Sequence, residues 1–147
     1  MDFEACSDAV EECYEYMLAY AAQGLNGDEG SASGGKLRTF LDRCVLGINN
    51  IVAAVSEAGV TGAYVKVIER DAADSLASVE LVLAQPFISS QLIDNLNASI
   101  HLRALLTDIF LIDEVVKIRT RASSKSEVAL GVDSPDSLLE TVPSNNN

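Results

Sequence analysis

Apolar residues recur at alternating intervals of three and four positions through three stretches of the chain. This interval keeps apolar side chains on one side of an α-helix, whereas a half-buried strand alternates every second residue. The three stripes are Phe3, Cys6, Val10, Cys13, Met17 and Tyr20; Leu37, Leu41, Cys44, Ile48, Ile51 and Val55; and Val65, Ile68, Ala72, Leu76, Val79 and Leu83. A helix with one apolar stripe must bury it against another element. The spacing therefore predicts an all-α protein.

Capping and turn-forming residues predict where the helices end. Asp2 suits the N-cap of the first helix, Gly59 suits the end of the second, and Pro86 ends the third. We expect an antiparallel four-helix bundle in a domain of residues 1–120, with helices over about 3–23, 36–58, 62–85 and 90–120. The Gly- and Ser-rich stretch 24–35 predicts a flexible loop, and the Ser-rich stretch 121–147 predicts a disordered C-terminal tail.

The fourth expected helix differs from the others because apolar residues occupy nearly all of its sides between Leu102 and Val116. A helix that is apolar on every side is buried on every side. Two arrangements satisfy this requirement: the helix is central in its own bundle, or a second chain covers part of it. We favour the second arrangement and predict a homodimer interface formed by Leu105, Ile109, Ile112 and Val116.

Acidic residues outnumber basic ones by 22 to ten, which gives a formal net charge of −12. This balance argues against nucleic-acid binding because phosphates would be repelled. The acidic residues cluster in the first expected helix, opposite its apolar stripe, as Glu4, Asp8, Glu11, Glu12 and Glu15. Arg38, Arg43, Lys66 or Arg70 of neighbouring helices could neutralise this face, and it could also be a merely solvated surface. The functional hypothesis is that it binds a basic protein partner.

Motifs for chemistry are weak or absent in the sequence. Residues 30–36 match the phosphate-binding pattern G-x-x-x-x-G-K, but Leu37 follows where Ser or Thr must hold magnesium, and a helix precedes where a strand is required. His101 is the only histidine, so a di-iron site with two Glu-x-x-His pairs is excluded. The three cysteines lack metal-site spacing and are expected to be reduced core thiols. We therefore expect no metal and no cofactor.

The sequence thus favours a protein that binds rather than catalyses. Our hypothesis is a non-catalytic helical bundle (an adaptor, a regulator or a partner-specific chaperone) for a basic or helical protein. A structural homo-oligomer is the first alternative, and a helical phosphotransfer protein that uses His101 is the second. The acidic N-terminal residues are unlike a signal peptide, and no apolar run reaches the length of a membrane span, so we expect a cytoplasmic protein that does not enter membranes.

Overall fold

The computed structural model describes residues 1–131, and in that part of the chain every regular element is an α-helix. The prediction of an all-α protein is therefore confirmed. The helices are α1 (Phe3–Ala21), α2 (Ala32–Glu57), α3 (Ala63–Leu83), α4 (Ser90–Ala98) and α5 (His101–Leu130). The predicted disorder of residues 132–147 lies outside the described residues.

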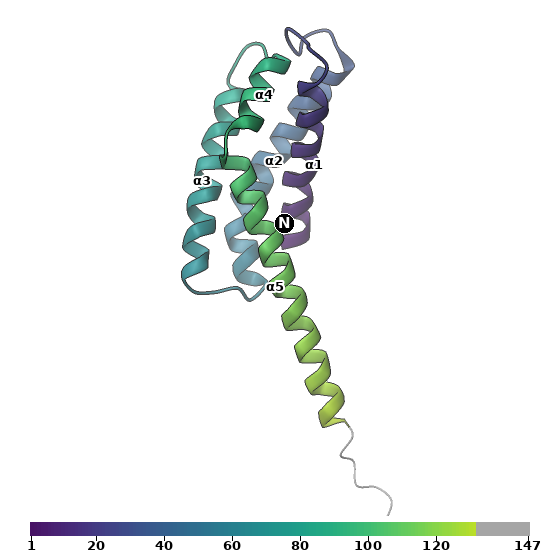
Figure 1. Ribbon diagram of the computed structural model, residues 1–147, viewed down its shortest axis with the longest axis vertical. Helices are drawn as coiled ribbons and strands as arrows, with labels where there is room; N and C mark the ends of the chain where they lie inside the picture. Colours follow the sequence, from purple (N-terminus) through teal and green to yellow (C-terminus); the bar gives the residue numbers. More distant parts are fainter. Residues whose placement is uncertain (132–147) are drawn as a thin grey trace, which may run out of the picture. The chain divides into compact units, whose positions relative to one another are not determined.

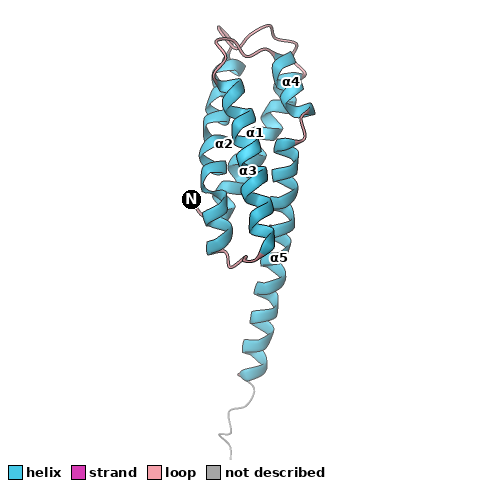
Figure 2. Ribbon diagram, turned by 90° about the vertical axis from the view of Figure 1, so that its left-hand side faces the viewer, coloured by secondary structure: helices cyan, strands magenta, loops and turns pink. Residues whose placement is uncertain are grey.

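The chain divides into two units, Met1–Val116 and Lys117–Asn147. In the first unit α2 packs against both α1 and α3, and α4 packs against both α1 and α3 (Figures 1 and 2). Residues 102–112 of α5 contribute to the same hydrophobic core. In the second unit, the described residues 117–131 are all exposed.

The core confirms the first two apolar stripes and shifts the third. All members of the first stripe except Phe3 are buried, and all members of the second stripe are buried. On α3 the buried residues are Ile68, Ala72, Ser75, Val79 and Val82, so Ser75 takes the place predicted for Leu76. The Ser75 hydroxyl donates a hydrogen bond to the His101 carbonyl oxygen at 2.9 Å. Because its polar group is satisfied, a serine can occupy this buried position between α3 and α5.

The expected single helix over 90–120 is instead two helices. Ser99 adopts an extended conformation (φ −62°, ψ 146°) after α4, and its hydroxyl donates to the Leu96 carbonyl at 2.6 Å. This hydrogen bond satisfies one of the carbonyls that a helix end leaves unpaired. The next helix, α5, extends to Leu130, so the prediction of disorder is wrong for residues 121–130. Ala, Arg, Lys and Glu in this segment favour helix, which offsets its serines.

The predicted homodimer interface is not an exposed surface. Leu105, Ile109 and Ile112 are 0–2% exposed and lie in the core of their own chain, with Val116 half-buried against it. The arrangement with a central helix, which the sequence also allowed, accounts for these residues. The exposed large apolar side chains on this part of α5 are Phe110 and Leu111.

The predicted flexible loop 24–35 is shorter than expected and is tied to the rest of the protein. Helix α2 begins at Ala32, because Ser31 caps it by accepting a hydrogen bond from the Gly34 N–H at 2.9 Å. Asp28, in the middle of the loop, is only 7% exposed. Its carboxylate accepts hydrogen bonds from Arg38 Nε at 2.5 Å and from the Ile88 backbone N–H at 2.7 Å.

Arg38 extends this link to the end of α3. Its two terminal nitrogens donate to the carbonyl oxygens of Leu83 and Gln85, at 3.2 and 3.0 Å. One arginine thus satisfies carbonyls that the helix end leaves free, while it neutralises the buried carboxylate. We call Asp28, Arg38 and their backbone partners the loop clamp, because together they join the α1–α2 loop to the α3–α4 loop.

Gly34 is required by the close approach of the loop to α2. A Cβ atom placed there would lie 1.9 Å from the Asp28 carbonyl oxygen, whereas a Cβ atom at Gly35 would meet nothing within 4 Å. We expect Gly34→Ala to lower the free energy of unfolding by more than about 3 kcal/mol, since backbone must move. The matched control Gly35→Ala should raise it by about 0.5–1 kcal/mol through helix propensity. Urea unfolding followed by circular dichroism measures both, and equal effects would contradict the steric argument.

The loop clamp also predicts acid sensitivity. Burial alone would raise the pKa of Asp28, but the hydrogen bonds from Arg38 and Ile88 outweigh it and hold that pKa below its ordinary 3.8. When folding lowers the pKa of a carboxyl group, the ionised group stabilises the fold at pH values above its pKa in the unfolded chain. This contribution is lost as pH falls through the pKa of the folded protein. We expect Asp28→Asn to cost about 2 kcal/mol at pH 7 and progressively less below pH 3.8. Asp8→Asn, on the exposed face of α1, is the control, and a cost independent of pH would argue against the clamp.

Candidate functional site

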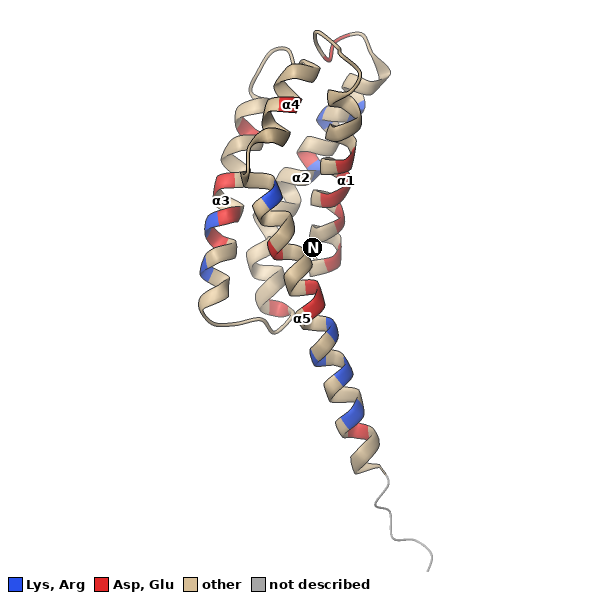
Figure 3. Cartoon of the chain, in the orientation of Figure 1, with Lys and Arg blue, Asp and Glu red and all other residues tan. Residues whose placement is uncertain are grey.

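The acidic face predicted from the sequence lies on the outside of α1 (Figure 3). Glu4, Asp8, Glu12 and Glu15 are exposed, and Glu11 is half-buried. The core stripe of the same helix, centred on Cys13 and Met17, is buried. The structure therefore places these acidic residues away from the core, as the spacing indicated.

Two of the five acidic residues have partners within the protein. Glu12 forms an ion pair with Arg43 of α2 at 2.7 Å, in which both side chains are about half exposed. Glu11 accepts a hydrogen bond from the Ser7 hydroxyl at 2.6 Å. The other three candidate cations are engaged elsewhere: Arg38 pairs with Asp28, Lys66 pairs with Glu69, and Arg70 Nε donates to the Lys66 carbonyl oxygen at 3.3 Å.

Four of the five acidic residues, all except Glu12, form a line along α1 that leads to a groove. Glu4, Asp8, Glu11 and Glu15 are spaced by four, three and four, and Leu18 continues this spacing. At 100° per residue these positions share one side of the helix, opposite the core. We call Glu4, Asp8, Glu11, Glu15 and Leu18 the acidic stripe. Leu18, 49% exposed, marks its apolar end.

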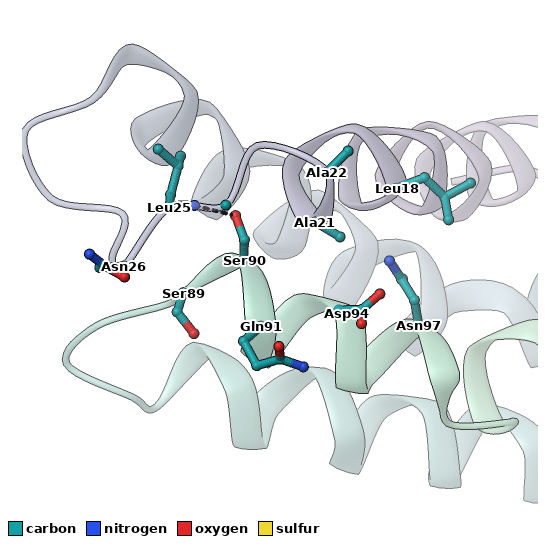
Figure 4. A pocket seen from close by; sticks show the side chains of 11 residues that line it. Leu18, Ala21, Ala22, Leu25, Asn26, Ser89, Ser90, Gln91, Asp94 and Asn97 are labelled. Atoms are coloured by element: carbon teal, nitrogen blue, oxygen red, sulfur yellow. Dashed lines mark hydrogen bonds between the residues drawn. The ribbon is translucent and has the colours of Figure 1, made fainter.

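The groove lies between the end of α1 and α4 (Figure 4) and has a volume of about 600 Å³. Small and apolar residues of α1 line one side, and polar residues of α4 line the other. The lining residues are Leu18, Ala21, Ala22, Gly24, Leu25, Asn26, Ser89, Ser90, Gln91, Asp94 and Asn97. Its volume is within the range of pockets that hold small ligands or side chains of a partner.

Hydrogen bonds between the two sides hold the end of this groove in place. The Ser90 hydroxyl donates to the Tyr20 carbonyl at 2.7 Å and accepts from the Leu25 N–H at 2.9 Å. The Ser90 N–H donates to the Leu25 carbonyl at 2.9 Å. The buried Tyr20 hydroxyl donates to the Ile88 carbonyl at 2.7 Å, next to the loop clamp. The groove is therefore a preformed feature rather than a gap between independent helices.

A second candidate is a pair of carboxyl groups between α3 and α5, the half-buried Asp71 and the buried Asp108. Asp108, 6% exposed, accepts a hydrogen bond from the Tyr64 hydroxyl at 2.6 Å, while its other carboxyl oxygen has no donor in the described structure. Burial raises the pKa of Asp108, and the adjacent Asp71 carboxyl raises it further, against the effect of Tyr64. A proton held between Asp71 and Asp108 satisfies that oxygen, because two close carboxylates do not both ionise.

This carboxyl cluster does not resemble a working acid–base site. Burial and the hydrogen bond to Asp108 raise the pKa of Tyr64 to about 12, far from the value that suits proton transfer at neutral pH. Asp108 is also too enclosed for a substrate to reach. We therefore interpret the cluster as a polar contact within the core.

The other residues that could take part in chemistry do not lie together in one site. His101 is half-buried at the start of α5, and its backbone carbonyl is held by Ser75. Cys6, Cys13 and Cys44 are buried free thiols; the hydrogen bond that the Cys13 thiol donates to Cys44, together with burial, raises the pKa of Cys13, so its reactive thiolate is suppressed. Of residues 30–36, which matched a phosphate loop, Ala32 to Lys36 lie within α2.

Among the described residues, no His, Cys, Asp and Glu side chains form a group of three that could hold a metal ion. None of the described helices combines the length and the apolar character that crossing a membrane demands. No family model, curated protein or solved structure matches the chain.

Sequence reasoning found the acidic face but missed the groove and the two buried carboxyl sites. The sequence did carry one signal, because Ser90, Asp94 and Asn97 stand at i, i+4 and i+7 and so share a helical face. Their position opposite α1 could not be inferred without the helix break at Ser99. No local pattern distinguishes Asp28 or Asp108 from the exposed acidic residues.

The carboxyl cluster predicts a stability change of opposite sign to that of Asp28. When folding raises the pKa of a group, the protonated group contributes its full stability at pH values below its pKa in the unfolded chain, here 3.8. This contribution is lost as pH rises through the pKa of the folded protein. Asp108→Asn keeps the shape without the charge. We expect it to be more stable than the wild type at pH 7, with the difference vanishing near pH 3.8. Urea unfolding at several pH values tests this, with exposed Asp74→Asn as the control; a less stable Asp108→Asn at pH 7 would refute the shared proton.

Proposed function

We propose that this protein is a non-catalytic protein-binding domain whose acidic stripe binds a basic amphipathic helix of a partner. One observation carries the proposal: Glu4, Asp8 and Glu15 form an exposed line on α1 with no ion pair in the described structure, and the line ends at a preformed groove. Acidic residues four apart on a helix repel one another by a few tenths of a kcal/mol. A basic partner relieves this repulsion.

The shape of the acidic stripe suits a helical partner. From Glu4 to Leu18 it covers 14 residue steps, about 21 Å at 1.5 Å per residue, which matches a partner helix of similar length. Lys or Arg at intervals of three and four would face the carboxylates. An apolar residue of the same partner would contact Leu18 at the end of the stripe.

The finer fold belongs to the same proposal. We propose that α4 and the first part of α5 together serve as the interrupted fourth helix of an antiparallel four-helix bundle. The contacts of α4 with α1 and α3, and the hydrogen bonds from Ser75 and Tyr64 of α3 to α5, support this arrangement. Three buried, unpaired thiols suit a reducing compartment such as the cytoplasm.

A homodimer is the second candidate, and it uses a surface other than the predicted interface. Ile100, directly before α5, and Ala104, Thr107 and Leu111 of α5 follow one another by four, three and four, and Ile100 and Leu111 are 67% and 50% exposed. This line is self-complementary when two copies pack about a two-fold axis. Light scattering decides: a monomer mass at all concentrations would eliminate the dimer.

Charge reversal on α1 tests the partner-binding proposal. The probe is a synthetic 21-residue amphipathic helix with Lys and Arg along one face, measured by fluorescence anisotropy. We expect Glu4→Lys, Asp8→Lys and Glu15→Lys together to weaken binding at least about threefold, since each exposed charge contributes about 0.2–1 kcal/mol. Glu12 is left in place because its reversal would also break the ion pair with Arg43.

A matched triple variant removes the effect of total charge. Glu57→Lys, Asp74→Lys and Glu80→Lys change the net charge equally, and all three positions are exposed on α2 and α3. This variant should bind the peptide nearly as well as the wild type, and salt should weaken both. Equal loss in the two triple variants would mean that only the overall charge matters, which would sink the acidic-stripe proposal.

A further inference from the structure

The two sides of the groove differ in chemistry. The α1 side, with Leu18, Ala21 and Ala22, offers only aliphatic contact at its side chains. The α4 side presents Asp94 and Asn97, which point toward α1 across the groove (Figure 4). A ligand that fills this space needs an apolar stem along one side and polar groups toward the other.

Asp94 gives the groove a negative charge. It is the only charged residue among those that line it, it is exposed, and no ion pair to it occurs in the described structure. The polar neighbours do not compensate it: Ser89 caps α4 by accepting from the Leu92 N–H, and Gln91 donates to Asn95. The groove therefore favours a cation.

Asn97 supplies the second polar group. Its side-chain oxygen and nitrogen are both inaccessible to solvent, and neither has a hydrogen-bond partner in the described structure. Leaving a buried amide unsatisfied is costly, and such groups in native proteins normally have a partner. Asn97 lies three residues after Asp94, so one planar group can contact both side chains.

We propose that this groove is the binding site for an arginine side chain of the partner's basic segment. The inference rests on the proposed function. It identifies the partner residue that enters the groove when the basic segment of the partner lies along the acidic stripe. The arginine methylenes lie along Leu18, Ala21 and Ala22, as amphipathic side chains bury their stems. The guanidinium donates two parallel hydrogen bonds to the Asp94 carboxylate, and a third to the Asn97 amide oxygen once the Asn97 side chain rotates to expose that oxygen to the groove. Lysine fits less well because its ammonium is a compact point charge without this planar fork.

A small probe tests the groove without any partner. The full chain, labelled with ¹⁵N, is titrated with Nα-acetyl-arginine amide, and backbone and side-chain amide signals are followed by NMR. The matched probe is Nα-acetyl-citrulline amide, which has nearly the same shape and no charge. We expect saturable shifts at the Asn97 side-chain amide and in residues 22–26 and 90–97 with the arginine probe, at roughly millimolar affinity, and much smaller shifts with citrulline.

Two variants assign the interaction to named residues. Asp94→Asn should weaken the arginine probe about fivefold, as loss of an exposed charged partner implies, while Asp74→Asn on α3 should leave it unchanged. Ala22→Phe, at the exposed end of α1, should fill the groove and abolish the shifts while the remaining spectrum stays that of the folded protein.

The outcomes separate this inference from the proposed function. Absent shifts up to tens of millimolar, equal shifts with both probes, or shifts confined to the region of Glu4 and Asp8 would overturn the groove as an arginine site. If the basic peptide binds and depends on the acidic stripe in that case, the proposed function stands without it. If the arginine probe binds in the groove but the basic peptide does not bind, the arginine site stands and the helix-binding function fails.

Discussion

The ion pair between Asp28 and Arg38 joins the α1–α2 loop and the start of α2 to the end of α3 and the α3–α4 loop. Burying either charge without the other would be costly. Each residue also satisfies backbone groups that have no partner within their own loop: Asp28 accepts from the Ile88 N–H, and Arg38 donates to the carbonyl oxygens at the end of α3. Through Ile88 the clamp reaches Tyr20, and through Ser90 the same loop is bonded to the end of α1. The groove between α1 and α4 exists because these bonds fix the start of α4 beside α1.

Carboxyl groups serve three physical roles in this acidic protein, and their surroundings decide which. Asp28 is ionised because Arg38 and a backbone N–H stabilise the charge. Asp108 is enclosed beside Asp71 and Tyr64, and this burial and the neighbouring Asp71 raise its pKa, so that a proton shared with Asp71 leaves the pair with one charge instead of two. Glu4, Asp8 and Glu15 of the acidic stripe are exposed and form no ion pair in the described structure. These are the carboxyl groups that bear on the proposed function, although all of the acidic residues look alike in the composition.

The proposed binding surface combines electrostatic and steric features of different kinds. A line of exposed charges attracts and orients a basic partner over a distance of several ångströms, but it discriminates poorly between partners. A groove with one carboxylate and one unsatisfied amide accepts only side chains of suitable shape. Because Leu18 belongs to both, a partner helix aligned along the acidic stripe would place a side chain at the groove.

The sequence by itself determined the helical class, the core faces of α1 and α2, and the acidic face of α1, because each depends only on residue spacing along one helix. The tertiary structure decided the break at Ser99, the burial of Leu105, Ile109 and Ile112 in their own chain, and the order imposed on the loop by Asp28. These features depend on hydrogen bonds and contacts between residues far apart in the chain, such as Arg38 with Leu83 or Ser75 with His101. No local pattern encodes such partners, because the free energy of burying a polar residue depends on which hydrogen-bonding groups the tertiary structure places next to it.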